Sequence, residues 1–156
     1  MSPGGGGSSA PPAATSSVPS FVRRLAAELR VPAGRKVAGV LADASGNTVG
    51  PTLANGSRYQ HADNQATLQP DGKWRRLTVA RAHVEGHAAG IMRERREHRD
   101  MHLVITQRPC EGDLGCDAML PALLPAGSRL TVWVRETEGA EPKKWRTYPG
   151  TGEGVL

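Results

Sequence analysis

Three side chains in the second half of the sequence carry donor atoms that suit a transition-metal ion. They are His83, Cys110 and Cys116, one imidazole and two thiols. Zn²⁺ favours such donors, and three protein ligands leave a fourth tetrahedral position open, as in catalytic zinc sites. Glu85 stands two places after His83, where a carboxylate can accept a proton from water and pass it on. These residue types therefore indicate metal-assisted hydrolysis.

The stretch HVEGH, which begins at His83, also resembles the helix motif of zinc proteases. His83 and His87 are four residues apart and would share one helix face. The protease motif, however, requires its glutamate directly after the first histidine, whereas Glu85 comes one position later. Gly86 and Gly90 would also weaken a rigid metal-binding helix. We therefore expect His87 to face the core or to support the site without binding the metal.

A simpler interpretation of the same residues remains open at this point. His83 would cap a helix, and the two cysteines would be small core residues or a disulfide pair. The sequence has no secretion signal, which makes a structural disulfide the less favoured option.

The elements that would position these residues follow from the spacing of apolar side chains. The pattern predicts helices over residues 20–30, with Ser20 as the cap, 84–98 and 116–124. Apolar runs predict strands over residues 36–43, 49–53, 101–107, 128–134 and 144–148, the first two forming a hairpin. The polar residues 54–73 are interpreted as a long surface loop, and residues 73–82 remain ambiguous.

Strands that alternate with helices predict a sheet with helices on its faces. Few residues follow Val134, and a parallel return needs a long crossover, so we expect the last two strands to form a hairpin. His83 would begin one helix and Cys116 another, and both first turns would face one edge of the sheet. The positive end of a helix dipole there favours a thiolate over a thiol.

Two basic clusters each hold a tryptophan among cations. They are KWRR and KKWR, in which the candidate contacts are Lys73, Trp74, Arg75, Lys143, Lys144 and Trp145. Cations contact phosphates and an indole stacks on a base, so these residues are candidate substrate contacts. The alternative is a solvated strand with its tryptophan in the core. The formal net charge of +5 is compatible with nucleic acid but does not decide the question.

The order H-x-E and then P-C is the signature of the zinc nucleobase deaminases. HVEGHAAGIMRE, followed by LVITQRPCEGDLGCDAMLPALLPAGSRLTVWV, resembles the DddA-like deaminases. These are bacterial toxin modules of the cytidine deaminase superfamily. The resemblance covers residues 20–135 and is most specific from 83 to 134. One departure is that five residues separate Cys110 from Cys116, instead of the two in the general signature.

The resemblance implies an α/β fold, a cytidine deaminase-like three-layer α-β-α sandwich whose central mixed sheet has about five strands. It implies Zn²⁺ held by His83, Cys110 and Cys116, with Glu85 as the catalytic proton carrier. The reaction would be hydrolysis of cytosine to uracil in DNA. Asn55, in the stretch ANG, falls where the family has a small substrate loop and is a candidate substrate contact.

Single-stranded DNA is the expected substrate, because the member known for attacking double-stranded DNA resembles the form with the short Cys–Cys spacing. Double-stranded DNA is the main alternative. RNA, a free nucleoside, and a non-catalytic zinc module that binds nucleic acid are the others. The linker and the basic clusters favour a polymer over a free nucleoside.

Residues 1–19, rich in Gly, Ser, Pro and Ala, predict a flexible linker. Residues 20–150 would form the zinc-dependent deaminase domain and residues 151–156 a flexible tail. We find no signal peptide and no apolar run long enough to span a membrane. The resemblance implies a monomeric module of a larger bacterial toxin, delivered into a target cell and neutralised by a cognate immunity protein.

Overall fold

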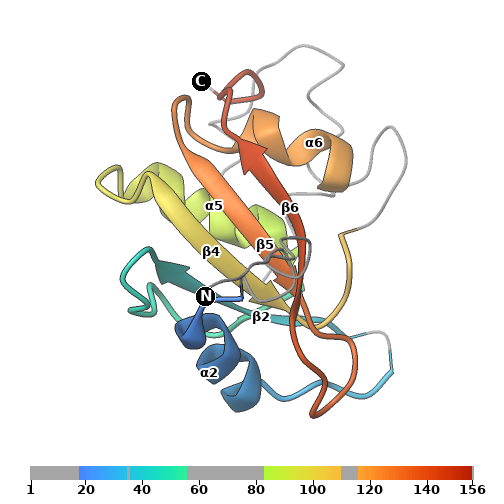
Figure 1. The fold of residues 1–156 in the computed structure, drawn as a ribbon. Helices are drawn as coiled ribbons and strands as arrows, with labels where there is room; N and C mark the ends of the chain where they lie inside the picture. Colours follow the sequence, from blue (N-terminus) through green and yellow to red (C-terminus); the bar gives the residue numbers. More distant parts are fainter. Residues whose placement is uncertain (1–17, 35, 56–82, 110–115, 156) are drawn as a thin grey trace, which may run out of the picture.

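The computed structural model describes residues 18–34, 36–55, 83–109 and 116–155. The helices in this part of the chain are α2 (Ser20–Glu28), α5 (Val84–Glu94) and α6 (Cys116–Leu123). The strands are β2 (Ala38–Asp43), β3 (Leu53–Ala54), β4 (Asp100–Ile105), β5 (Arg129–Val134) and β6 (Lys143–Pro149). Figure 1 shows their arrangement. None of the described helices is long and apolar enough to cross a bilayer.

The strands form one five-stranded sheet in the order β3-β2-β4-β5-β6. Strands β4 and β5 are parallel, and every other neighbouring pair is antiparallel. The predicted mixed sheet and the predicted hairpin of the last two strands are therefore confirmed. A parallel pair needs a crossover, and α6 supplies it between β4 and β5.

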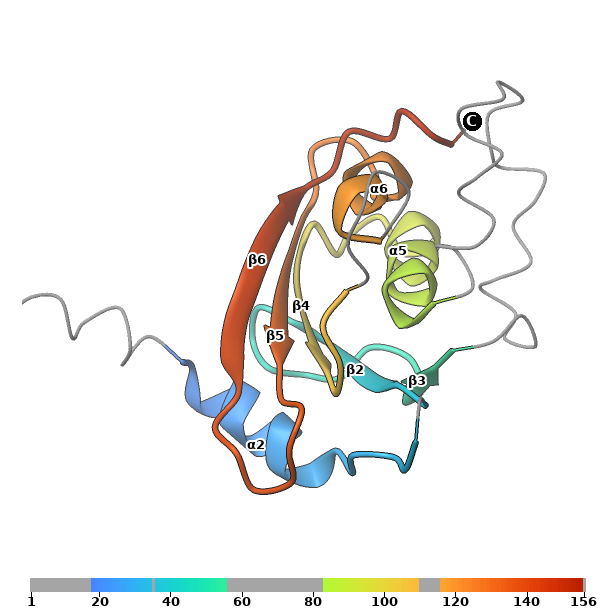
Figure 2. The same cartoon turned by 90° about the vertical axis from the view of Figure 1, so that its right-hand side faces the viewer.

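Helices cover both faces of this sheet (Figure 2). Helix α2 packs on one face, where its buried stripe Val22, Leu25 and Leu29 meets Val104 and Trp133. Helices α5 and α6 pack on the other face in a larger aliphatic core. Neighbouring residues of β4 and β5 contribute to opposite cores, as the side-chain alternation of a strand requires. The predicted three-layer α-β-α sandwich is confirmed.

The main differences between the predicted and observed helices are the cap of α2 and the end of α5. The residue at the N-cap position of α2 is Pro19, without a side-chain cap hydrogen bond, so the prediction of Ser20 as the cap is wrong. Helix α5 ends at Glu94, not at residue 98, with Arg95 as its C-cap. After Met92 the sequence offers no apolar side chain to bury another turn until β4 begins, which explains the early end.

Both α5 and α6 begin at the sheet edge where β4 and β5 end. Helix α6 starts there because it carries the crossover between two parallel strands. Helix α5 starts there because a short turn, residues 95–99, joins its end to the beginning of β4 (Figure 1). We call this edge the carboxyl edge of the sheet. The sequence predicted that the first turns beginning at His83 and Cys116 would face one edge of the sheet.

The final described residues contact α6. The N–H groups of Thr151 and Gly154 donate to the carbonyls of Pro121 and Ala122, at 2.9 and 3.0 Å. Residues 151–155, predicted as part of a tail, therefore lie against the crossover helix. Of the predicted linker, residues 1–17 lie outside the described residues, and Val18 packs beside the α2 core.

Candidate active site

The first turn of α5 brings three predicted site residues together. His83 is the N-cap residue, with extended backbone angles of φ −84 and ψ 165. The side-chain oxygen of Asn55, just after β3, accepts the N–H of Val84 at 3.1 Å. Glu85 lies in the same turn. Asn55 therefore satisfies a free donor of the helix end and sits beside the candidate catalytic residues.

A close approach of β2 fixes this turn against the sheet. A Cβ atom on Gly39 would lie 2.5 Å from the Val84 Cγ1 atom. Any larger residue at position 39 would therefore push α5 away from β2. The absence of a side chain at Gly39 sets how deeply the first turn is buried.

Burial makes the polar groups of this turn unusual. Glu85 is 4% exposed, and His87 is 0% exposed. Ionisable groups are rarely buried so fully without a reason, because desolvation disfavours their charged forms. Buried carboxylates beside a second titratable group are typical of chemically active sites. The full burial of His87 agrees with the expectation that it faces the core or supports the site.

His83 is half-buried at the start of this turn. Desolvation by burial lowers the pKa of its imidazole. A neutral imidazole keeps a lone pair on one ring nitrogen, and this is the form that binds a metal ion.

The first turn of α6 is anchored to β6 by Asp117, a residue that sequence analysis missed. Its carboxylate accepts hydrogen bonds from the Tyr148 hydroxyl at 2.6 Å and from Trp145 Nε1 at 3.2 Å. Arg146 donates to its second oxygen at 2.8 Å. Burial, and then the hydrogen bond to Asp117, raise the pKa of Tyr148, so this phenol remains protonated. The network fixes the turn in which Cys116 lies.

Part of the predicted metal set lies outside the described residues. Cys110 is outside them, and for Cys116 the structure gives the backbone position at the start of α6 only. Within the described ranges, no three His, Cys, Asp or Glu side chains are grouped to hold a metal ion. Lys73, Trp74 and Arg75 also lie outside the described residues.

The second basic cluster lines a cavity of about 350 Å³ at the carboxyl edge. Lys143, Lys144 and Trp145 form part of its wall, together with Arg108 and the loop between β5 and β6. Trp145 packs against the aliphatic core, as the alternative interpretation of its cluster required. It lies where a β-bulge shifts the register of β5 and β6.

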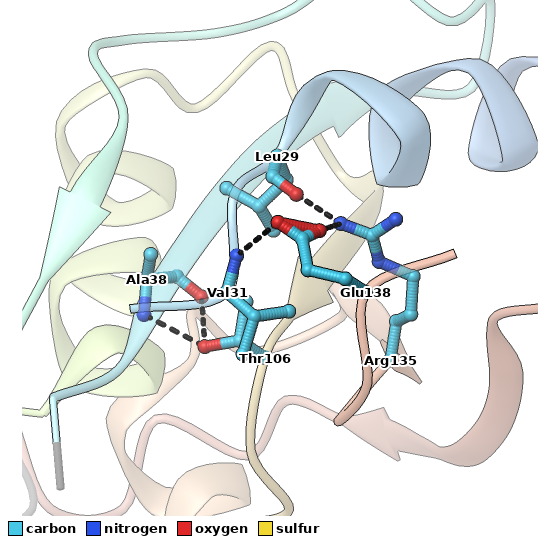
Figure 3. Close-up of polar contacts among 6 residues, drawn as sticks. All are labelled: Leu29, Val31, Ala38, Thr106, Arg135 and Glu138. Carbon is cyan, nitrogen blue, oxygen red and sulfur yellow. Dashed lines mark hydrogen bonds and ion pairs between the residues drawn. The ribbon is translucent and has the colours of Figure 1, made fainter. Parts of the chain in front are cut away.

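A polar clasp holds the loop that forms this wall (Figure 3). Arg135 is 4% exposed, and its guanidinium donates to the Leu29 carbonyl at the end of α2 and to Glu138 at 3.4 Å. Glu138 in turn accepts the N–H of Val31 at 3.2 Å. The start of the β5–β6 loop is thus tied to the chain segment that follows α2.

Comparison with known families agrees with this arrangement. A family model of SCP1.201-like deaminases matches residues 14–150. The chain belongs to the SCP1.201-like deaminase family. No curated protein sequence matches it. Deaminases of this superfamily are generally zinc-dependent hydrolases, and the three-layer sandwich of this deaminase is consistent with a cytidine deaminase-like fold.

Proposed function

We propose that this deaminase hydrolyses cytosine to uracil in DNA, with single-stranded DNA favoured over double-stranded DNA. The observation that carries the proposal is the buried Glu85 carboxylate beside His83, in a chain of a deaminase family. Hydrolytic deamination needs a group that takes a proton from water and gives it to the departing amine. Glu85 is shielded from bulk solvent in the first turn of α5.

His83, Cys110 and Cys116 would hold the zinc ion. The donor set fits, because burial favours the neutral imidazole of His83 and because Cys116 begins a helix, where the dipole favours a thiolate. When bound, zinc would supply Lewis acidity that makes water more acidic.

The protein's own residues then have separate tasks. Glu85 accepts a proton from the attacking water and delivers protons to ring N3 and to the amine at C4, which leaves as ammonia. Asn55 holds the first turn of α5 through Val84 and so keeps Glu85 in place. The substrate base must lie outside a stack to reach this turn, which a single strand allows at the lowest cost.

The biological role proposed is that of a toxin module. The resemblance of the stretches around His83 and Cys110 to DddA-like deaminases supports it. We propose delivery into a target cell as part of a larger bacterial protein, action as a monomer, and neutralisation by a cognate immunity protein.

The experiment is a product analysis with the purified full chain. Matched single-stranded DNA, double-stranded DNA, RNA and free deoxycytidine are incubated with it, and uracil is read by sequencing or by chromatography. We expect conversion of cytosine in DNA, faster in the single strand, and about one zinc per chain. Faster conversion of the duplex would reverse the strand preference. Conversion of RNA or deoxycytidine alone would contradict the proposed substrate, and no conversion at all would contradict the proposed function.

A further inference from the structure

The cavity at the carboxyl edge carries an excess of positive charge. Arg135 is engaged by Leu29 and Glu138, and Glu141 pairs with Arg23 on α2. Among the residues that the structure describes, the other charged groups that line the cavity are three cations, Arg108, Lys143 and Lys144, and one carboxylate, Glu136. Such a wall favours an anionic ligand.

Arg108 is the cation in the most defined position. It follows the end of β4, just before Cys110, and its guanidinium carbon lies 5.8 Å from the centroid of the Trp145 ring. That ring is itself fixed, because its N–H group donates to Asp117 and to the Tyr148 hydroxyl. Trp145 therefore supports Arg108 and connects it, through Asp117, to the first turn of α6.

The ion pair between Arg108 and its present partner is weak enough for another anion to replace that partner. Its Nε atom lies 3.7 Å from a carboxylate oxygen of Glu136, beyond hydrogen-bond distance, and both side chains are more than half exposed. Exposed ion pairs of this kind contribute less than about 1 kcal/mol. A phosphate accepts two parallel hydrogen bonds from a guanidinium and is the stronger partner.

We propose that Arg108 binds a backbone phosphate next to the target cytosine, and that this phosphate replaces Glu136 as its partner. Trp145 acts as a positioning residue for the guanidinium, not as a platform for a base. The inference rests on the proposed function in one respect, that the substrate is a polynucleotide. It adds a binding site that recognises the phosphate and not the base.

The test is a binding measurement in a Glu85→Gln background, which leaves the substrate unconsumed. A fluorescein-labelled single-stranded DNA oligonucleotide with one cytosine is titrated at several NaCl concentrations. Arg108→Ala should weaken binding about tenfold and reduce the slope of log K against log salt by about 0.7. Glu136→Gln should tighten binding about twofold to fivefold, because it removes the competing anion.

The chain offers a matched control at the opposite edge of the sheet. Arg129 and Asp100 also form an exposed ion pair, at 2.8 Å, where β4 and β5 begin. Arg129→Ala and Asp100→Asn should leave both affinity and salt slope unchanged. Equal effects of Arg108→Ala and Arg129→Ala would overturn the inference, and so would an unchanged salt slope in Arg108→Ala or no binding by the background protein.

The outcomes also separate this inference from the proposed function. If the wild-type protein produces no uracil but oligonucleotide binding depends on Arg108, the proposed deamination is wrong and the phosphate site stands. If the wild-type protein converts cytosine and Arg108→Ala binds as well as the control variant does, only the phosphate site is wrong.

Discussion

The two faces of the sheet bury different kinds of side chain. The α2 face is closed by aliphatic and aromatic groups, among them Leu25 and Trp133. The face under α5 and α6 has the larger aliphatic core, yet Glu85 and His87 in the first turn of α5 are also buried. On the α2 face, the buried Arg135 and the partly buried His102 therefore lie beside an apolar core, whereas on the other face two buried ionisable groups lie within one helix turn.

This difference indicates that the two faces contribute differently to activity and to stability. Burial of a carboxylate costs free energy, which the aliphatic core of the same face must offset. The α2 face contributes stability and, through the clasp of Arg135 and Glu138, holds the loop beside the cavity. Substitutions on the two faces should therefore separate activity from stability.

The largest effect is expected for Glu85→Gln on the face under α5 and α6, which we call the chemical face. The amide has the shape of the carboxylate but cannot accept the proton, so kcat should fall by about 10²–10⁴-fold or more. Uracil formation in single-stranded DNA measures the rate. Zinc content and thermal unfolding serve as controls and should remain close to wild type. Residual activity within tenfold of wild type would show that Glu85 does not carry the proton.

The second largest effect is expected for Leu25→Ala on the face covered by α2, which we call the packing face. Leu25 is 3% exposed, and truncation of a buried leucine costs about 2–5 kcal/mol of unfolding free energy. Urea denaturation measures this loss. At a temperature where the variant is still folded, its kcat should match that of wild type, because α2 lies across the sheet from Glu85. A large fall in kcat with full folding would break the division between the faces.

Much of the sandwich was predictable because it follows from local patterns. The apolar runs of β2, β4 and β5 and the stripe of α2 appear within short windows of sequence, and each window predicts its own element. The sequence also directed attention to His83 and Glu85, because their spacing is itself the signal. Helix ends were less predictable, since Pro19 replaces the expected cap Ser20 and α5 ends before its polar run does.

The contacts that complete the site were not predictable in the same way. Asp117 is a first-turn carboxylate beside a candidate ligand, which is a usable signal, but its partner Tyr148 comes from a distant strand. Arg108 and Trp145 likewise come into contact only when β4 and β6 are assembled in the sheet. Such pairings depend on strand order and on the β-bulge near Trp145, which no local window contains.

A smaller effect is expected for Tyr148→Phe on the chemical face. The variant keeps the ring but removes the hydroxyl that donates to Asp117 at 2.6 Å. A hydrogen bond to a charged group contributes about 1.5–3 kcal/mol, which urea denaturation would show as lost stability. Arg146→Ala removes an exposed partner of the same carboxylate and should cost less than about 1 kcal/mol. The reverse order would show that the network is held from its exposed side.

The smallest effect tests whether the packing face also responds to pH. On that face Trp133 Nε1 donates to His102 Nδ1 at 3.0 Å, and the Phe21 ring contacts the same imidazole edge-on. Burial lowers the pKa of His102 below its ordinary value of 6.5; nearby Asp100 opposes this shift, while Arg129 and Lys144 add to it. The accepting nitrogen must be unprotonated, so protonation breaks the bond.

Because the folded-state pKa is lowered, the unfolded chain takes up the proton first as the pH falls. The contribution of His102 to stability is therefore complete above about pH 6.5 and is lost below it. We expect wild type to lose more unfolding free energy than His102→Gln between about pH 7.5 and about pH 5.5, by no more than about 1 kcal/mol, the worth of one hydrogen bond. Glutamine keeps an acceptor for Trp133 but does not titrate, and every other ionisable group is common to both proteins. Parallel stability curves would show that the hydrogen bond to His102 does not control the pH response of the packing face.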